Sequence, residues 1–312
     1  MQADGRVDAA RAVQAVQAAQ TSLLDRLTDA ARAAERESGV TVRDLRDDEM
    51  AAASALYAEV WVVGPGASPM EPGLLVALGF AGSYVSGAFD DTGTLVGSCA
   101  GFLGVGPGGG TPLLHSHIAA VRRGSARGTG TALKLHQRAW CAARGVGVIG
   151  WTYDPLIARN AWFNLGRLGA HVEAYLVDFY GPMDDGLNAG EESDRLLVHW
   201  RVEPEERTAP AEPARAHAGL LVGDDGGPVA HPAVPVDADA VTLAVPRDVE
   251  GLRASGAPGA RAVASRWRST FRDAYADLHE QGWRVRRFAR EGHYLLGRTT
   301  GDPSQDPTQD PS

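Results

Sequence analysis

A glycine-rich basic turn between an apolar strand and a helix is the feature that most restricts how this chain can fold. The segment runs from Val121 to Lys134 and reads VRRGSARGTGTALK. Gly128 and Gly130 allow the backbone to approach a ligand closely, because neither carries a Cβ. The helix that follows would present unpaired N–H groups at its positive end. The sequence therefore predicts a strand, an anion-binding turn and a helix in succession.

The local charge also favours an anionic ligand at this turn. Between Thr92 and Tyr153 the sequence contains no Asp or Glu, whereas the whole chain has a formal net charge of −9. The same stretch carries five arginines and Lys134, the only lysine of the chain. This contrast indicates a focused positive field for a small anion, and not the broad basic face of a nucleic-acid-binding protein. A surface helix with ordinary charges is the competing interpretation.

Length and composition limit the class of protein. The 312 residues are enough for about two domains of ~150 residues each. Cys99 and Cys141 both lie in apolar segments, which is typical of buried thiols and not of a disulfide framework or a metal site. The sequence has no apolar run of the ~18 residues that a membrane span needs, and no basic start followed by an apolar block. We therefore expect a cytoplasmic protein without a membrane partner.

The distribution of apolar, Gly and Pro residues divides the chain into five regions. Residues 1–40 are rich in alanine and predict a long helix. Residues 41–203 predict the main domain, and the Pro, Glu, Ala and Gly residues of 204–240 are typical of a linker. Residues 241–298 predict a smaller β-α-β-β lobe. The polar repeat of residues 299–312 predicts a disordered tail.

Hydrophobic periodicity predicts the order of elements within the main domain. Strands are expected over 41–45, 84–89, 94–103, 112–121, 146–152, 171–179 and 195–202, and helices over 47–60, 73–78, 129–144 and 156–168. This order describes a mixed central β-sheet flanked by helices on both faces, which is an α/β or α+β fold.

Two segments of the main domain resemble the acyl-CoA-binding core of the GNAT acyltransferase superfamily. The turn over Ser125 to Gly130 has both glycines of the family's pattern, with serine at the first position, where Arg or Gln is usual. The segment from Arg159 to Ala170 resembles the family's helix that ends in Leu-Gly-Phe, with Leu165 where a tyrosine is frequent. The resemblance implies a GNAT-like catalytic domain over residues 41–203.

Further segments resemble a poorly characterised bacterial subgroup of predicted GNAT acyltransferases that carries a C-terminal extension. They are Trp151 to Leu156, Asn160 to Asn164, Tyr180-Gly181, Leu187-Asn188 and Asp194-Arg195. The resemblance extends into residues 241–297.

The resemblance implies that acetyl-CoA or another acyl-CoA is the co-substrate, with no metal. Backbone N–H groups over Ile118 to Val121 would polarise the thioester carbonyl, since this strand splays from its neighbour in the family. Asn160 is a candidate for a hydrogen bond to the cofactor or the substrate. The remaining cofactor contacts are expected from Ala119, Arg127, Gly128, Thr129, Gly130 and Thr131.

Two histidines on the strand before the turn are candidates for the general base. His115 and His117 alternate along the strand, so they share one face. An imidazole with a pKa near 6.5 can accept a proton at neutral pH. We favour His117 as the base because it is nearer the turn, and we place His115 at the substrate. The competing interpretation is that they are hydrogen-bonded histidines of a half-buried strand.

Four further residues are candidates for contacts with the reacting groups. Tyr175 and Tyr180 could protonate the departing thiolate, since a phenol pKa near 10 is close to that of a thiol, or they could be core residues. Asp154 could hold the amine or cap the following helix. Arg195 could bind a carboxylate of the acceptor or acyl group, or pair with a neighbouring aspartate.

These observations favour an acyl-CoA-dependent N-acyltransferase acting on the amine of a small molecule such as an amino acid. The acyl group would be acetyl or of the succinyl type, and neither cysteine lies in a nucleophile setting, so direct attack in a ternary complex is expected. The alternative is a non-catalytic acyl-CoA-binding or regulatory protein. A P-loop enzyme is excluded because the turn lacks the Gly-Lys-Ser/Thr ending. Nucleic acid is not expected as a partner, and a homodimer is possible through the N-terminal helix.

Overall fold

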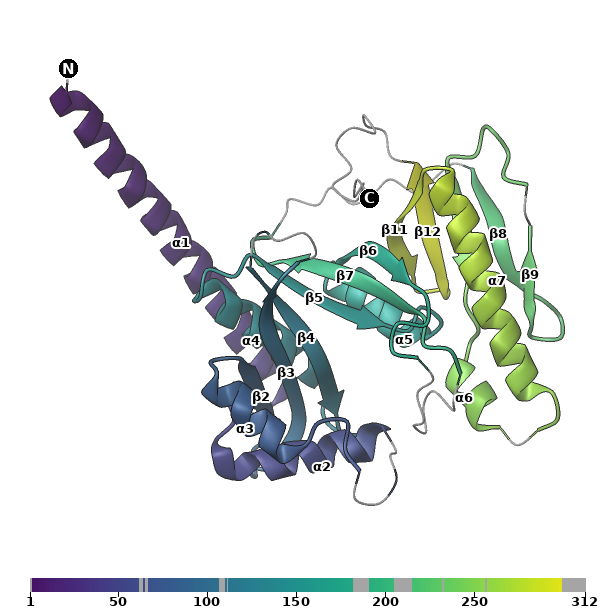
Figure 1. Cartoon of the computed structure of the whole chain (residues 1–312), viewed down its shortest axis with the longest axis horizontal. Helices are drawn as coiled ribbons and strands as arrows, with labels where there is room; N and C mark the ends of the chain where they lie inside the picture. Colours follow the sequence, from purple (N-terminus) through teal and green to yellow (C-terminus); the bar gives the residue numbers. More distant parts are fainter. Residues whose placement is uncertain are drawn as a thin grey trace. The chain divides into compact units, whose positions relative to one another are not determined.

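The tertiary structure, a computed structural model, comprises two compact units (Figure 1). The first unit contains Met1–Thr152, Asp184–Leu187 and Leu197–Glu206, and the second contains Tyr153–Met183, Asn188–Leu196 and Arg207–Ser312. The structure describes residues 2–61, 64, 67–106, 110, 112–181, 191–204, 215–231, 233–255 and 257–298, without the side chains of 2–13 and 16.

The larger sheet has seven strands. They are β1 (Thr41–Asp44), β2 (Tyr84–Phe89), β3 (Leu95–Val105), β4 (Pro112–Val121), β5 (Val148–Tyr153), β6 (His171–Leu176) and β7 (Arg195–Arg201). Their spatial order is β1-β2-β3-β4-β5-β7-β6. The pairs from β1 to β4 are antiparallel, and β4 pairs with β5 in parallel. The sheet is therefore mixed, as the sequence predicts.

Helices cover both faces of this sheet in the first unit. They are α2 (Met50–Trp61) and α3 (Pro72–Phe80), with the 3-10 turn η1 (Asp47–Glu49) before them, and α4 (Thr129–Ala142). On β2, Tyr84 packs edge-on against Trp140 of α4 at 5.4 Å between ring centroids. The next residue, Val85, joins an apolar cluster with Leu56 of α2 and Leu75 of α3. Because successive strand residues point to opposite faces, α4 lies on one face and α2 and α3 lie on the other.

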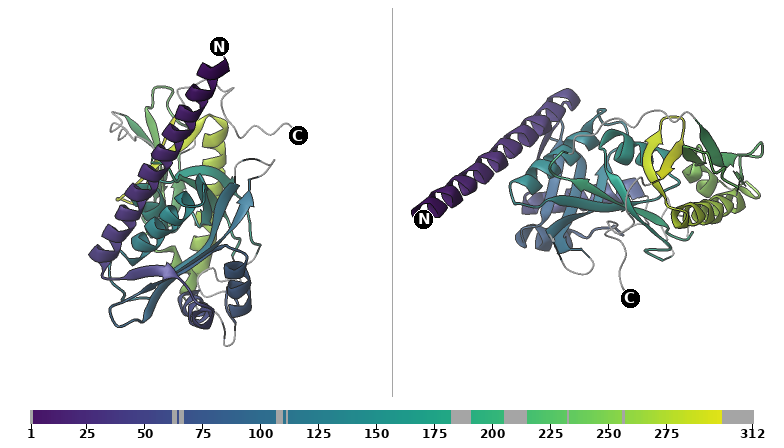
Figure 2. Two further views of the ribbon diagram at one scale, coloured as in Figure 1. Left: turned by 90° about the vertical axis from the view of Figure 1, so that its left-hand side faces the viewer. Right: turned by 90° about the horizontal axis from the view of Figure 1, so that it is seen from above.

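The N-terminal helix predicted from the alanine-rich segment is present as α1 (Gln2–Ser38). Its C-terminal half packs along α4, and its N-terminal part extends beyond the sheet (Figure 2). Ser38 closes the helix with a hydroxyl that donates to the carbonyl of Ala34. Burial of Leu27 and Ala31 shows which stripe of the helix faces the first unit.

The second unit is built around a five-stranded sheet in the order β11-β12-β10-β8-β9. The strands are β8 (Ala216–Val222), β9 (Pro228–Ala230), β10 (Ala240–Ala244), β11 (Trp283–Ala289) and β12 (His293–Arg298), and the helices are α6 (Val249–Ala254) and α7 (Ala260–Glu280). Its core contains large buried aromatic side chains, among them Trp267, Phe271, Trp283 and Tyr294.

The prediction that residues 204–240 form a linker is wrong for residues 216–230. These residues form β8 and β9, and β8 pairs in parallel with β10. Proline and glycine mark a break in local periodicity, but the backbone of β8 finds its hydrogen-bond partners in β10, which a local pattern does not reveal. The tail predicted over 299–312 lies outside the described residues.

The helix predicted over 156–168 is shorter and irregular. It consists of α5 (Ala158–Ala161) and a π-helical turn, η2 (Trp162–Arg167). The strand predicted over 171–179 ends at Leu176, because the chain turns at Asp178, whose φ of 44° is left-handed. Among the described residues, no helix is both long and apolar enough to cross a membrane.

Candidate functional site

The parallel pairing of β4 and β5 stops part-way along both strands. Registered pairs join Leu113 to Val148, Leu114 to Ile149 and His115 to Gly150. Within the described residues, no registered pair joins these strands beyond His115 and Gly150, although β4 continues to Val121. We call this divergence the fork, formed by Ser116–Val121 of β4 and Trp151–Thr152 of β5. Backbone groups along the fork are suited to hydrogen-bond an extended ligand, as an added strand would.

A β-bulge shapes β4 at the start of the fork. Phe102 of β3 pairs with His115 and Ala100 pairs with Ile118, so Ser116 and His117 together oppose Gly101. A Cβ on Gly101 would lie 2.6 Å from the carbonyl oxygen of His115. Glycine is therefore required here, since only a residue without a side chain allows β3 and β4 to approach this closely.

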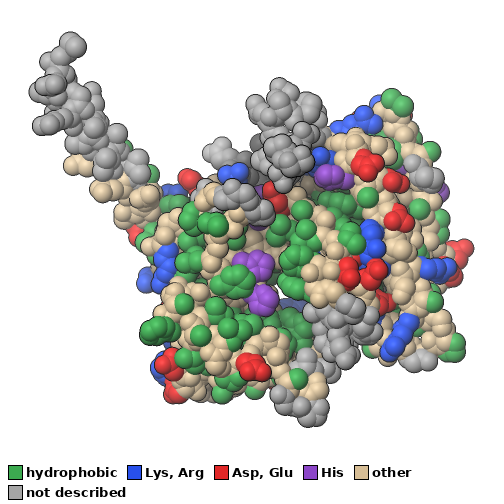
Figure 3. Space-filling model, in the orientation of Figure 1, with side chains coloured by type: hydrophobic (Ala, Val, Ile, Leu, Met, Phe, Trp, Pro, Cys, Tyr) green, Lys and Arg blue, Asp and Glu red, His purple; other side chains and the backbone are tan. Residues whose placement is uncertain are grey.

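The bulge brings three aromatic rings together beside the fork. The ring centroids of His115 and His117 lie 5.9 Å apart, and that of Phe102 lies 5.0 Å from His115 and 5.9 Å from His117. Histidine side chains gather on the face of the molecule shown in Figure 3. The two imidazoles thus share one face of the strand, as the alternation of the sequence predicts.

Both imidazoles favour the neutral form. Burial, and then the neighbouring charges of His117 and Lys134, lower the pKa of His115 from 6.5 to about 4. Burial also lowers the pKa of His117, whose side chain is the more exposed of the two. Each ring therefore keeps a lone pair at neutral pH, which is what a general base requires.

The glycine turn leads directly from the end of β4 to the start of α4. Gly128 has a φ of 99°, a left-handed conformation that favours glycine, and a Cβ there would lie 3.2 Å from the Cβ of Ser38. No side chain caps the helix at this position. The N–H groups of Gly130 and Thr131, in the first turn, precede the residues that can find an intrahelical acceptor. N–H groups of this kind are suited to an anion, and anion binding at the turn stays a prediction.

Asp154 is committed to ion pairs within the second unit. Its side chain is 4% exposed, and its carboxylate accepts hydrogen bonds from Arg268 at 2.7 and 2.9 Å and from Arg253 at 2.8 Å. It also accepts the N–H of Leu156 at 2.9 Å. Burial alone would raise the pKa of Asp154, but the two guanidinium groups hold it below its usual value. Of the two roles weighed for Asp154, capping the following turn is the one that the hydrogen bonds match.

The two candidate tyrosines differ in environment. The hydroxyl of Tyr175 donates to Asp194 at 2.6 Å, and its ring lies 5.0 Å from that of Tyr275. Burial and this hydrogen bond raise the pKa of Tyr175. Tyr180 is 41% exposed. The hydroxyl of Tyr175 is thus engaged inside the second unit, whereas Tyr180 as a residue is more exposed to solvent.

The other second-unit candidates are Arg195 and Asn160. Arg195 is buried, donates from Nη1 to the backbone carbonyl of Asp194, and lies over the ring of Tyr180 with Cζ 5.5 Å from its centroid. Burial lowers the pKa of Arg195. Asn160 is half-buried on α5. Asp184 and Asp185, two of the carboxylate partners weighed for Arg195 from the sequence, lie outside the described residues.

The candidates therefore fall into two groups. His115, His117, the fork and the turn lie together in the first unit, while Asp154, Asn160, Tyr175, Tyr180 and Arg195 lie in the second. Sequence reasoning missed Gly101 and Ser116. A glycine inside a strand pattern is a known sign of a bulge, and could have indicated Gly101.

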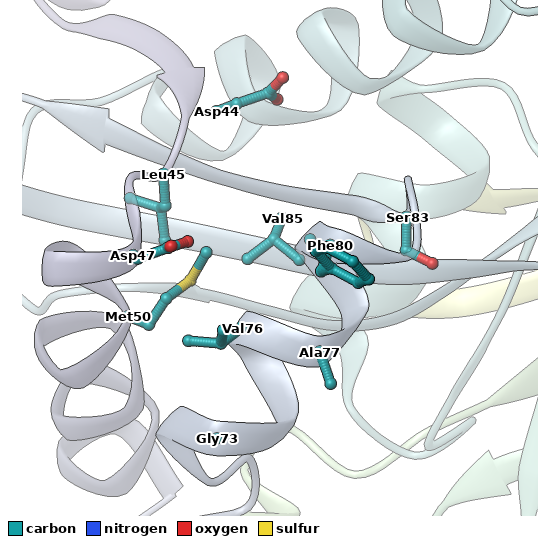
Figure 4. A pocket seen from close by; sticks show the side chains of 11 residues that line it. Asp44, Leu45, Asp47, Met50, Gly73, Val76, Ala77, Phe80, Ser83 and Val85 are labelled. Atoms are coloured by element: carbon teal, nitrogen blue, oxygen red, sulfur yellow. The ribbon is translucent and has the colours of Figure 1, made fainter.

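A separate cavity of about 440 Å³ lies on the α2 and α3 side of the sheet (Figure 4). Its lining is mostly apolar and includes Leu45, Met50, Val76 and Val85, with the exposed ring of Phe80 at its edge. None of the predicted site residues lines this cavity. It contains neither His115 nor His117, and no residue of the glycine turn.

No protein-family model and no curated protein matches the sequence. Similar solved structures include a putative acetyltransferase, yncA, from Salmonella typhimurium with acetyl-CoA, at 14% identity and a TM-score of 0.42, covering 55% of this chain and 99% of the other. Arabidopsis thaliana Naa50 with a bisubstrate analogue is 16% identical, with a TM-score of 0.41, over 52% of this chain and 97% of its own.

A GNAT superfamily phosphinothricin acetyltransferase from Sinorhizobium meliloti, in complex with AcCoA, is 16% identical with a TM-score of 0.40. The match covers 55% of this chain and 96% of the other. The first and third of these structures are thus named as acetyltransferases. Their identities and TM-scores are low, and they assign no role to a residue of this chain.

Proposed function

We propose that the chain is an acyl-CoA-dependent N-acyltransferase that transfers an acetyl or succinyl-type group to the amine of a small molecule. The observation that carries the proposal is the fork between β4 and β5, which leads at the end of β4 into the uncapped N-terminus of α4. An acyl-CoA has the two features that such a surface fits. It carries a pyrophosphate, and a flexible arm with amide groups that ends in a thioester.

The two ends of the surface would bind different parts of the donor. Helix N-termini favour phosphate through unpaired N–H groups and the helix dipole, so the pyrophosphate is assigned to Gly128–Thr131. The exposed side chain of Arg127 adds positive charge there. The arm is assigned to the edge of β4, where backbone groups of Ile118–Val121 would pair with its amides and polarise the thioester carbonyl.

The histidines beside the fork account for the proton that the amine loses. The amine nitrogen attacks the carbonyl carbon, the C–S bond breaks, and His117 accepts the proton that the amine loses. A neutral imidazole is the form that can do this, and the lowered pKa of His117 maintains it at neutral pH. His115 is assigned to substrate contact. We assign protonation of the thiolate to Tyr180, because the hydroxyl of Tyr175 already donates to Asp194.

A carboxylate on the acceptor or on the acyl group is assigned to Arg195, whose guanidinium is suited to carboxylate recognition. We assign no substrate contact to Asp154, because Arg253 and Arg268 occupy its carboxylate.

The first test is binding by the purified full chain. Calorimetry with CoA, acetyl-CoA and succinyl-CoA should show binding, and ATP should bind far more weakly because it lacks the pantetheine arm. Release of free CoA thiol should then be followed with a panel of amino acids and other small amines. Equal binding of ATP and acyl-CoA, or no binding of either, would refute the proposal. Binding of acyl-CoA without transfer to any amine would favour the non-catalytic alternative.

A pair of glycine variants tests the turn itself. Gly128→Val should weaken CoA binding by at least about tenfold, because φ is 99° there and Ser38 lies close. Gly145→Val is the matched control, since Gly145 follows the other end of α4 with a φ of 68° and open space around it. Equal loss of binding in both variants would show that backbone strain, and not the turn, is responsible.

A further inference from the structure

Lys134 is a buried cation at the fork that neither the sequence nor the proposed reaction explains. Its side chain is 5% exposed and faces the sheet from α4. Nζ donates to the hydroxyl of Ser116 at 2.8 Å and to Oε1 of Gln137 at 3.1 Å, and it lies 3.9 Å from the ring centroid of Trp151. Among the described residues, no carboxylate forms an ion pair with it.

A buried ammonium without a counter-charge is unfavourable. Burial lowers the pKa of Lys134 accordingly, although the nearby thiols of Cys99 and Cys141 partly oppose this shift. The direct contacts of the ammonium group are two neutral acceptors and an aromatic face. Methionine would fill a similar volume without a buried charge. The contacts of Lys134 therefore need a reason beyond packing.

The partners of Lys134 lie where β4 and β5 separate. The last registered pair joins His115 to Gly150. Ser116 is the next residue of β4, and Trp151 is the next residue of β5. One side chain thus contacts both strands at the first position beyond their pairing. Gln137, one turn further along α4, fixes the ammonium and also donates to Sγ of Cys99 on β3 at 3.3 Å.

We propose that Lys134 is a positioning residue that holds β4 and β5 in a fixed relation at the fork, so that the arm of the acyl-CoA donor can bind along β4. This inference rests on the proposed function. It makes Lys134 responsible for the separation of β4 and β5 that the function requires. Lys134 touches neither the donor nor the acceptor in this role. It acts through Ser116 and Trp151.

A second explanation is electrostatic, because Lys134 also lies one turn beyond the N-terminus of α4. In that case its charge would mainly favour the pyrophosphate end of the donor. The two explanations differ in which part of the donor loses affinity when the charge is removed. Adenosine 3′,5′-bisphosphate, which carries phosphate groups but lacks the pantetheine arm, separates them.

The experiment compares Lys134→Met with a matched control, Arg138→Met, by calorimetry on the full chain. Arg138 lies one turn further along α4, donates to the carbonyls of Arg201 and Val202, and lies 4.4 Å from the ring centroid of Trp200. It resembles Lys134 as a cation over a tryptophan of the sheet, but it does not contact the fork.

Lys134→Met should weaken CoA binding by at least about tenfold, while adenosine 3′,5′-bisphosphate binds within about twofold of wild type. In turnover, KM for acyl-CoA should rise with kcat little changed at saturation. Arg138→Met should keep wild-type affinity for both ligands. Unchanged CoA affinity in Lys134→Met, or an equal loss for both ligands, would overturn the inference.

Ser116→Ala provides the test if Lys134→Met does not fold. It removes one of the two hydrogen-bond acceptors of Lys134 and should weaken CoA binding by about threefold, with the bisphosphate unaffected. Wild-type affinity for CoA in this variant would then count against the inference. Failure of the wild-type protein to bind CoA would instead contradict the proposed function.

Discussion

The two units bury charge in different ways. In the first unit, Lys134 is held by a hydroxyl, an amide oxygen and an indole ring. In the second, Asp154 is held by the guanidinium groups of Arg253 and Arg268, and Arg253 also donates to Glu191.

The two buried charges differ in the segments of the chain that they hold together. Asp154 follows β5, Arg253 lies on α6 and Arg268 lies on α7, so their ion pairs join three segments of the second unit. Lys134 has neutral partners and connects two strands at one position. We infer that the charge of the second unit mainly maintains its fold, whereas that of the first mainly adjusts a site. The predictions below test this contrast.

The largest effect is expected for Asp154→Asn. This change leaves two buried guanidinium groups without their shared carboxylate, and it should lower the free energy of unfolding by about 3–5 kcal/mol. Urea unfolding followed by circular dichroism measures it. Asp237→Asn is the control, since its pair with Arg215 is exposed on both sides and should leave the unfolding midpoint unchanged. If Asp154→Asn unfolded at the same urea midpoint as wild type, the ion pairs of Asp154 with Arg253 and Arg268 would have no structural role.

His117→Ala should affect the reaction and spare the fold. Loss of a general base should lower kcat by about 100-fold, while CoA affinity and the unfolding midpoint stay near wild type because His117 does not belong to the buried core. Steady-state kinetics with a saturating amine measures the change, and His231→Ala, an exposed histidine of the second unit, serves as control. A wild-type kcat in a reaction limited by chemistry would move the base to another residue.

The stability of the first unit should depend on pH through His115. Its pKa is lowered to about 4 in the fold, so between pH 4 and about 6.5 the unfolded state binds the extra proton. The contribution of His115 to the free energy of unfolding is present above about pH 6.5 and is lost as the pH falls towards 4. Wild type should therefore lose about 1–2 kcal/mol more than His115→Leu over this range. Parallel urea curves for the two proteins at each pH would contradict the prediction.

Tyr175→Phe should have the smallest effect. It removes one hydrogen bond to Asp194, which keeps its pair with Arg272, so unfolding should become easier by about 1 kcal/mol. kcat should stay at its wild-type value, because this hydroxyl is engaged within the second unit. Tyr180→Phe is the comparison and should lower kcat. If Tyr175→Phe reduced turnover and Tyr180→Phe did not, the proton donor would have to be reassigned.

Local sequence patterns predicted the positions of helices and strands better than they predicted where these elements end and which strands pair. The strand, turn and helix over β4 and α4 lie where periodicity and glycine place them. Periodicity extends the helix after β5 to residue 168, whereas the structure has one α-helical turn and a π-helical turn. Residues 216–230 were predicted as linker, because their strand character depends on pairing with β10. Such pairing is a long-range contact.

The sequence by itself determined the glycine turn, its positive charge and the shared face of His115 and His117. These features depend on residues close together in the chain, where backbone geometry sets the spacing. Tertiary structure alone decided where β4 and β5 separate, and it placed Lys134 at that position. It also chose the partners of Asp154, which lie 99 and 114 residues away. Which charges are buried together depends on packing between distant segments, and no local period encodes that.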